Sequence, residues 1–138
     1  MALYTAIATT TGGRNGHTET NDGVIKFDLT LPPSLGGAAK PGATNPEQLF
    51  ACGYSACFGQ ALDVTARKHK LSPEQVRVTA EVSLDKNAEG GFMLATVLRI
   101  GLPGLSREDA EKVMHEAHHI CPYSNATRGN MQVDLVLE

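Results

Sequence analysis

The stretch NPEQLFACGYSACFGQALDVTARK, residues 45–68, predicts one long helix whose middle is apolar. Asn45 suits the N-cap, Pro46 suits the first helical position, and Gln48 stands where a capping-box partner belongs. Residues 49–62 are apolar or small all the way round, and a helix without a polar face is normally buried on every side. One short chain offers too few strands to enclose such a helix. We therefore expect a partner subunit to cover part of it.

Segments with strand character lie on both sides of this helix. Upstream, strands are predicted over residues 3–10, 17–20 and 24–31, with a hairpin signal at Asn21-Asp22-Gly23. Downstream, apolar and polar residues alternate over 76–85, and a turn at 87–91 returns the chain to a second strand over 92–102. Helix, strand and turn therefore follow one another without a regular βαβ order.

The C-terminal part predicts a second helix and a closing strand. Ser106 suits an N-cap with Asp109 at the capping-box position, and the helix should run to about residue 119. Residues 131–137 alternate again. The order of elements indicates an α+β fold with antiparallel sheets, in a single domain over residues 1–138.

Composition excludes several classes of protein. The chain has 138 residues, of which 41% are hydrophobic and 20% charged, so it can bury a core. Its net charge of −3 argues against nucleic acid as the main partner. The longest uncharged stretch, 48–62, is too short to span a bilayer, and the first ten residues lack the pattern of a signal peptide. We expect a cytoplasmic protein without a membrane partner.

Three cysteines, Cys52, Cys57 and Cys121, are the first candidates for chemistry. An odd count in a reducing compartment does not suggest a disulfide framework, which leaves buried spectators, metal ligands or reactive thiols. Cys52 and Cys57 point in different directions on a helix, about 140° apart. Cys121 precedes Pro122, so it should be extended and stand near the N-cap of a short helical turn. Backbone N–H groups there favour a thiolate.

Two charged residues have both a structural and a functional interpretation. Arg14 stands in a loop with glycines on both sides, which lets its guanidinium reach inward, although a solvated loop charge is the commoner explanation. Glu47 lies in the first turn of the predicted helix, where it could simply compensate the helix dipole.

A histidine pattern offers an alternative chemistry. His115, Glu116 and His119 match H-E-x-x-H, which on a helix can bind zinc with the glutamate as general base. No convincing third ligand follows, and Cys121 is the nearest candidate. A polar helix face explains the same residues, so a zinc hydrolase stays as an alternative.

Four segments together resemble the organic hydroperoxide resistance proteins, a branch of the wider family that includes the osmotically inducible OsmC proteins. They are TGGR at 11–14, NPEQLF at 45–50, GYSACF at 53–58 and CPYSNATRGN at 121–130. The last run is long and specific, and the resemblance extends over nearly the whole chain. It implies an OsmC-like fold, in which antiparallel sheets wrap around the long central helices of an intertwined homodimer.

The resemblance also implies a thiol peroxidase that reduces organic hydroperoxides to alcohols without a cofactor or metal. Cys57 would be the peroxidatic thiol, Cys121 the resolving thiol, and Arg14 with Glu47 the charged pair that supports the thiolate. The reductant would be a lipoylated protein or dihydrolipoamide. Cys52 has no role in the family pattern.

Helix geometry adds two expectations to this interpretation. Glu47 and Cys57 are ten residues apart, or about 15 Å along a helix, so one guanidinium cannot contact both on the same helix. Either Glu47 comes from the partner subunit or the helix does not begin at Pro46, and we expect the first. The helical neighbours Phe50, Tyr54 and Phe58 should line the site and favour bulky apolar peroxides. A non-catalytic dimeric binding module, with thiols used only for packing, is the other alternative.

Overall fold

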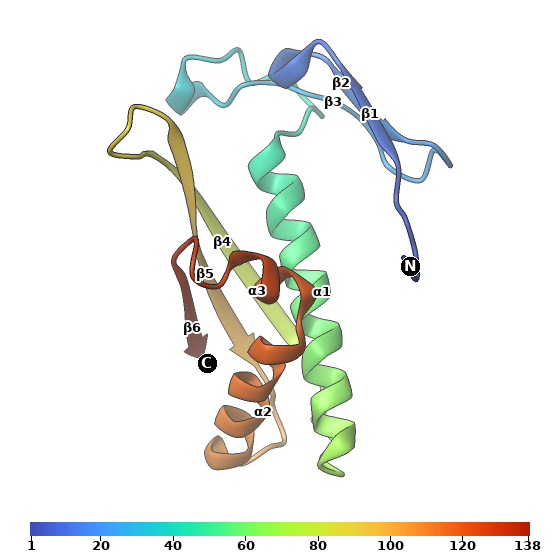
Figure 1. Ribbon diagram of the computed structural model, residues 1–138, viewed down its shortest axis with the longest axis vertical. Coiled ribbons are helices and arrows are strands. Elements are labelled where there is room, and N and C mark those ends of the chain that lie inside the picture. The colour runs from blue at the N-terminus through green and yellow to red at the C-terminus, as the bar shows by residue number, and fades with distance from the viewer. The chain divides into compact units, whose positions relative to one another are not determined.

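The computed structural model describes all residues from 1 to 138 and has an α+β fold (Figure 1). Its strands are β1 (Ala8–Thr11), β2 (His17–Thr20), β3 (Lys26–Asp28), β4 (Arg77–Lys86), β5 (Phe92–Gly101) and β6 (Val133–Leu137). Its helices are α1 (Pro46–Lys68), α2 (Arg107–Ile120) and α3 (Pro122–Thr127), with short 3-10 turns at Gly13–Asn15 and Pro33–Leu35. The chain divides into two compact units, Met1–Leu49 and Phe50–Glu138. A single domain over 1–138 stays a prediction.

The first unit is an antiparallel sheet of order β1-β2-β3 with almost no core of its own. Strand β2 spans the predicted residues, whereas β1 and β3 are shorter than predicted because pairing stops at Ala8 in β1 and at Asp28 in β3. Ile25 and Phe27, expected on a buried face, are 41% and 45% exposed. A unit this small cannot enclose its own apolar residues.

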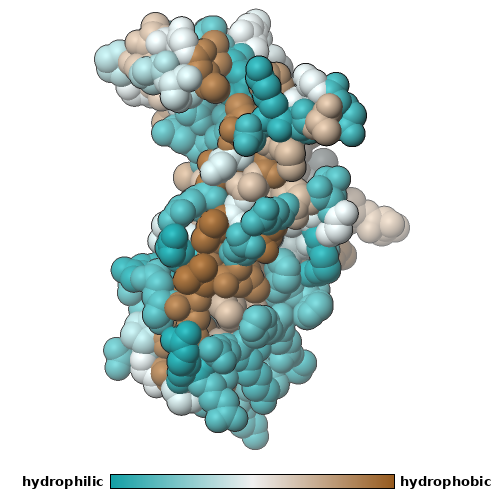
Figure 2. All heavy atoms as spheres, turned by 90° about the vertical axis from the view of Figure 1, so that its left-hand side faces the viewer, coloured by the Kyte–Doolittle hydropathy of each residue, from teal (hydrophilic) through white to brown (hydrophobic).

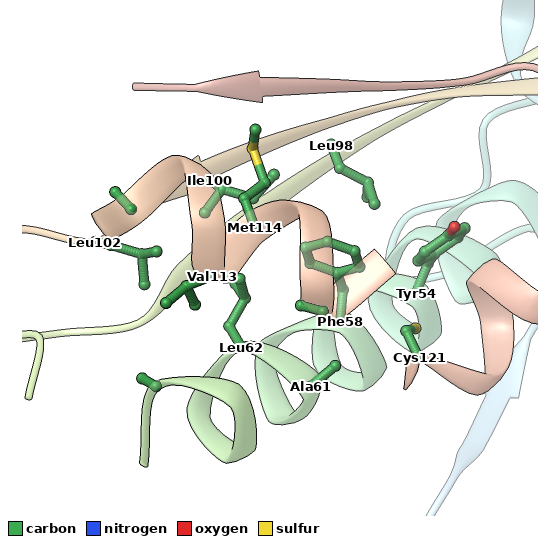
Figure 3. Packing of buried hydrophobic residues seen from close by; sticks show 13 residues of the cluster. Tyr54, Phe58, Ala61, Leu62, Leu98, Ile100, Leu102, Val113, Met114 and Cys121 are labelled. Carbon is green, nitrogen blue, oxygen red and sulfur yellow. The ribbon is translucent and has the colours of Figure 1, made fainter. Parts of the chain in front are cut away.

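The second unit holds the hydrophobic core, between α1, α2 and the sheet β4-β5-β6. Figure 3 shows Phe58 and Leu62 of α1 pointing into the same layer as Val113 of α2 and Leu98 of β5. These four side chains are fully buried. The core therefore packs the helix that carries Cys57 firmly against the sheet.

One sheet prediction is wrong, because β6 pairs with β5 in parallel rather than antiparallel. A parallel pair needs a crossover connection of a dozen or more residues, and α2 with α3 supply it between the two strands. The β4–β5 pair is antiparallel, as expected from the turn at 87–91. The crossover brings Cys121, at the junction of its two helices, over one face of the sheet.

Helix α1 begins and ends where the sequence predicts, and the Gln48 N–H donates to Asn45 Oδ1 at 2.9 Å. Within one chain only part of its surface is buried. Along the middle of the helix the exposed residues form a stripe four residues apart, namely Cys52, Ala56, Gln60 and Val64. Burial on every side is thus not achieved by a single chain. No helix in the chain has the length and apolar character that crossing a membrane requires.

Large apolar side chains also reach the surface elsewhere. Phe92 and Met93, at the start of β5, are 67% and 44% exposed. Figure 2 shows such hydrophobic side chains among hydrophilic ones on one face of the molecule.

Candidate active site

The sulfur atoms of Cys57 and Cys121 meet in the second unit. Cys121 Sγ lies 3.5 Å from Cys57 Sγ, and all three cysteines are free thiols. Cys121 is fully buried and Cys57 is partly exposed, so of these two thiols Cys57 is the one open to a substrate, while Cys52 is exposed on the surface. A disulfide needs about 2.05 Å between the sulfurs, so a shift of about 1.5 Å would join them.

Cys121 forms the corner between two helices, as the sequence predicts. It is the C-cap of α2 and the N-cap of α3, with an extended backbone at φ −64° and ψ 121°. Its N–H donates to the Ala117 carbonyl and its own carbonyl accepts from the Asn125 N–H, each at 2.9 Å. The following Pro122 favours this extended conformation. Because the thiol makes no capping bond, its sulfur is free to face Cys57.

Gly53 allows α3 to approach α1 closely. A Cβ at Gly53 would lie 2.7 Å from the Tyr123 hydroxyl oxygen and 3.2 Å from its ring. The Tyr123 ring also packs against Phe50 and Tyr54, with ring centroids 5.9 and 5.6 Å apart. This packing places the backbone N–H of Tyr123 where it hydrogen-bonds to the Cys57 sulfur. Neither Gly53 nor Tyr123 was predicted as a site residue, although both lie inside the quoted motifs.

The second unit alone does not activate Cys57. Burial raises the pKa of the Cys57 thiol, the hydrogen bond from the Tyr123 N–H lowers it, and the Cys121 thiol raises it again. The net direction is upward, away from the thiolate that a nucleophile requires. A positive charge must therefore be supplied if Cys57 is to react at neutral pH.

The first unit holds such a charge in a fixed position. Arg14 donates two hydrogen bonds to Glu47, from Nη1 to Oε2 at 2.8 Å and from Nη2 to Oε1 at 2.6 Å. This paired geometry is the strong form of an arginine–carboxylate contact. The hydrogen bond to Glu47 raises the pKa of Arg14, and the hydrogen bond from Arg14 lowers the pKa of Glu47. The pair stays ionised at every physiological pH.

Glycines shape the loop that presents Arg14. A Cβ at Gly16 would lie 1.7 Å from the Thr11 carbonyl oxygen, so only glycine allows the loop to close there. That Glu47 acts beside the Cys57 of the partner subunit stays a prediction, since the structure shows only that Arg14 and Glu47 pair within one chain. The helix start at Pro46 is nevertheless as predicted, so the distance argument along α1 still applies.

The three residues expected to line the site differ in exposure. Tyr54 and Phe58 are completely buried in the core, whereas Phe50 is partly buried beside a groove of about 550 Å³. Apolar side chains contribute most of this groove's wall, among them Phe50, Phe92, Met93, Leu94 and Met131. Direct contact of all three residues with a substrate stays a prediction.

The histidine pattern does not form a metal centre. Glu116 accepts hydrogen bonds from Lys68 Nζ at 2.5 Å and bonds His69 Nε2 at 2.6 Å. These partners lower the pKa of Glu116 to about 2, which makes it a poor general base. No group of three His, Cys, Asp or Glu side chains is arranged to hold a metal ion. Glu116 therefore connects α1 and α2, and the structure gives no support to the zinc alternative.

Comparison with known proteins identifies relatives along the whole chain. The OsmC-like protein family matches residues 37–136. The organic hydroperoxide resistance protein OhrB of Bacillus subtilis is 45% identical, with all of both chains covered. A protein of the same name from Xanthomonas axonopodis pv. citri is 46% identical over 98% of this chain and 94% of its own length. The crystal structure of an organic hydroperoxide resistance protein from Legionella pneumophila is 51% identical, covers 100% of this chain and 99% of its own, and has a TM-score of 0.94.

Proposed function

This chain belongs to the OsmC family, in the branch of the organic hydroperoxide resistance proteins, and on that basis we propose that it reduces organic hydroperoxides to alcohols through Cys57. The observation that carries the proposal is the 3.5 Å separation of Cys57 Sγ and Cys121 Sγ, with one sulfur accessible and the other buried. Such a pair can cycle between two thiols and a disulfide.

The proposed reaction has two steps. The Cys57 thiolate attacks the terminal oxygen of R–O–O–H, the O–O bond breaks, and the alkoxide leaves and takes up a proton to give the alcohol. Cys57 is then a sulfenic acid. The Cys121 sulfur next attacks the Cys57 sulfur, the S–O bond breaks, and hydroxide leaves with the thiol proton as water. The product is a Cys57–Cys121 disulfide.

Arg14 is the proposed cation for the thiolate, and it would act on the partner's site. Arg14 is bound to Glu47 in the first turn of α1, and Cys57 lies ten residues further along the same helix. That separation is about 15 Å, beyond the reach of one guanidinium. If Arg14 supports a thiolate while it holds Glu47, the thiolate belongs to a second copy of the chain. Glu47 then orients the guanidinium.

A homodimer is also supported by the apolar surface of the single chain. The exposed stripe of α1 and the half-exposed Ile25 and Phe27 of the first unit lack cover within one chain. Isolated apolar side chains are common on protein surfaces, but a uniformly apolar helix is normally enclosed. We infer that a second subunit covers these faces.

The groove beside Phe50 supports an apolar peroxide as substrate. Its aromatic, leucine and methionine side chains favour a hydrocarbon group over water or hydrogen peroxide. Tyr54 would support this wall through its contact with Phe50, with ring centroids 6.0 Å apart, and Phe58 packs in turn against Tyr54 at 6.5 Å.

Completion of the cycle requires an external dithiol. A disulfide of this kind is reduced by thiol–disulfide exchange, and the family resemblance points to a lipoylated protein or dihydrolipoamide. Such exchange operates in a reducing compartment, so we place the protein in the cytoplasm.

Thiol titration tests the proposal directly. One equivalent of cumene hydroperoxide should remove two of the three thiols, because Cys52 is the one not used. Cys57→Ser should consume no peroxide, whereas Cys52→Ser should behave as the unmodified protein. If all three thiols survive, the chain is a binding module and the peroxidase proposal is wrong.

A further inference from the structure

A buried chain of polar side chains joins the three helices around the two cysteines. The Tyr54 hydroxyl of α1 lies 2.8 Å from Ser124 Oγ of α3. Ser124 Oγ lies 2.8 Å from Nδ1 of His118, in the last turn of α2. Tyr54 and Ser124 are fully buried, so water does not compete for these bonds. The proposed chemistry assigns no part to this Tyr54–Ser124–His118 chain.

Every hydroxyl in the chain can be satisfied at once. If His118 donates from Nδ1, Ser124 donates to Tyr54, and Tyr54 donates to Thr127 Oγ1 at 3.3 Å. The Thr127 hydroxyl then donates to the Ser124 carbonyl, also at 3.3 Å. A neutral imidazole fits this order, because burial, followed by the charge of Arg128, keeps the pKa of His118 below its usual value. Hydrogen bonds in such a sequence strengthen one another in a dry interior.

The Tyr54–Ser124–His118 chain lies about one helical turn from the sulfurs of Cys57 and Cys121. Tyr54 precedes Cys57 by three residues, and His118 and Ser124 stand three residues before and after Cys121. Residues three apart on a helix are neighbours. The Tyr54–Ser124 bond therefore links the turn beside Cys57 to the turn beside Cys121.

The same chain closes the corner at Cys121. The His118–Ser124 bond connects the end of α2 to the start of α3, with Cys121 between them. A second tie lies outside it, since the Arg128 guanidinium donates to the His118 carbonyl and, at 2.8 Å, to Asn125 Oδ1. The angle between the two helices, and with it the position of the Cys121 sulfur, is thus fixed by side chains.

We propose that Tyr54, Ser124 and His118 are positioning residues that hold Cys121 Sγ within reach of Cys57 Sγ for disulfide formation. The inference rests on the proposed function, in which Cys121 attacks the Cys57 sulfenic acid and water leaves. A second peroxide molecule competes in that step, because it can oxidise the sulfenic acid to a sulfinic acid. A sulfur held in position reacts faster than a free one, so the Tyr54–Ser124–His118 chain favours the disulfide over the sulfinic acid.

The first test measures that competition. Ser124→Ala removes the central hydroxyl, Tyr54→Phe removes only its partner, and Ser124→Thr keeps a hydroxyl at the same place. After treatment with excess cumene hydroperoxide, mass spectrometry gives the ratio of Cys57 sulfinic acid to Cys57–Cys121 disulfide. We expect this ratio to rise about tenfold in Ser124→Ala and Tyr54→Phe and to return toward normal in Ser124→Thr.

A matched control separates positioning from stability. Val113→Ala opens a cavity in the same core but touches no member of the chain, so it should lower the melting temperature without changing the ratio. Ser124→Ala should consume the first equivalent of peroxide at the normal rate, because the thiolate attack does not involve Ser124. A ratio that is unchanged in Ser124→Ala and Tyr54→Phe, or that changes equally in Val113→Ala, overturns the inference.

A second test does not depend on peroxide. Diamide takes up two electrons and two protons as the two thiols become a disulfide, so its reaction reports how closely the sulfurs are held. Disulfide formation with diamide should be about tenfold slower in Ser124→Ala than in Val113→Ala. Equal rates overturn the positioning role, whatever the peroxide assay gives. If diamide forms the disulfide more slowly in Ser124→Ala, but the unmodified protein does not react with peroxide, the positioning role is supported and the proposed function is wrong.

Discussion

Arg14 binds both carboxylate oxygens of Glu47 within one chain, at 2.6 and 2.8 Å, and Glu47 belongs to the same helix as Cys57. The helix that carries Glu47 also carries the Cys57 thiol, and these two residues are about 15 Å apart along its axis. Two questions can therefore be tested separately. The first is whether Arg14 activates a Cys57 thiol, and the second is whether that Cys57 belongs to its own chain or to the partner subunit.

Arg14→Ala should slow the reaction with peroxide at neutral pH about tenfold or more. Burial already raises the pKa of Cys57, and loss of the guanidinium leaves that effect unopposed. The reactive thiolate should then form only at higher pH, so the pH–rate profile shifts upward. Arg67→Ala is a matched control, since Arg67 pairs with Asp63 on the surface. A profile that does not shift would count against Arg14.

Heterodimers test whether Arg14 acts across subunits. In a dimer of one Arg14→Ala chain and one Cys57→Ser chain, the first chain keeps Cys57 and the second keeps Arg14. If Arg14 acts across the interface, these two residues form one complete site. Copurified heterodimers with two different tags should therefore show about half the activity of the unmodified dimer, because one of two sites is complete. If Arg14 acted on the Cys57 of its own chain, the heterodimer would have no complete site and would keep only the residual activity of one Arg14→Ala site.

Cys121→Ser should separate the two chemical steps. Its Cys57 still meets the peroxide, because of these two thiols Cys121 is buried and Cys57 is the accessible one. One equivalent of alcohol should form per chain, after which Cys57 remains a sulfenic acid that dimedone labels. Steady turnover with a dithiol at the normal rate would show that Cys121 is not the resolving thiol.

Gly53→Ala should push Tyr123 away from α1. The added methyl group would lie 2.7 Å from the Tyr123 hydroxyl oxygen, which is too close for any real contact. We expect a loss of about 1–3 kcal/mol in the free energy of unfolding, measured by urea denaturation. The Gly53→Ala/Tyr123→Ala double variant should recover part of it relative to the sum of both single changes. Strict additivity of the two effects would contradict the close packing.

Glu116→Gln should change how stability depends on acid. The hydrogen bonds from Lys68 and His69 lower the pKa of Glu116 from its usual 4.5 to about 2 in the folded protein. A group with a lowered folded pKa stabilises above its unfolded pKa and loses that contribution as the pH falls. Stability should therefore decline between about pH 4.5 and pH 2, and Glu116→Gln should flatten this part of the profile. An identical decline in both proteins would assign the effect to other carboxylates.

The sequence predicted the elements that have strong local signals. The Asn45 cap and Pro46 fix the start of α1, and Pro122 fixes the extended corner at Cys121, because both effects act within a few residues. The parallel pairing of β5 and β6 was not predictable in this way. It depends on how the α2–α3 crossover folds back over the sheet, and the alternation in residues 131–137 carries no information on strand direction.

The site was predictable only in part, for a similar reason. The family motif identified the two cysteines, but no periodic pattern reveals that the Tyr54 hydroxyl meets Ser124, seventy positions away. Nor could the sequence distinguish the buried Tyr54 and Phe58 from the more accessible Phe50, since all three lie on one apolar helix. The Arg14–Glu47 contact joins residues 33 positions apart and was predicted from the family motifs, not from any spacing pattern.

The two sulfurs lie 3.5 Å apart in space but 64 positions apart along the chain, and this has a thermodynamic consequence. A covalent bond between them would close a long loop and reduce the conformational entropy of the unfolded chain, a stabilisation of about 4 kcal/mol in the simplest treatment. Each turnover would then move the protein between a more and a less heat-resistant form. A thermal-shift measurement would read the oxidation state of the enzyme population without any chemical label.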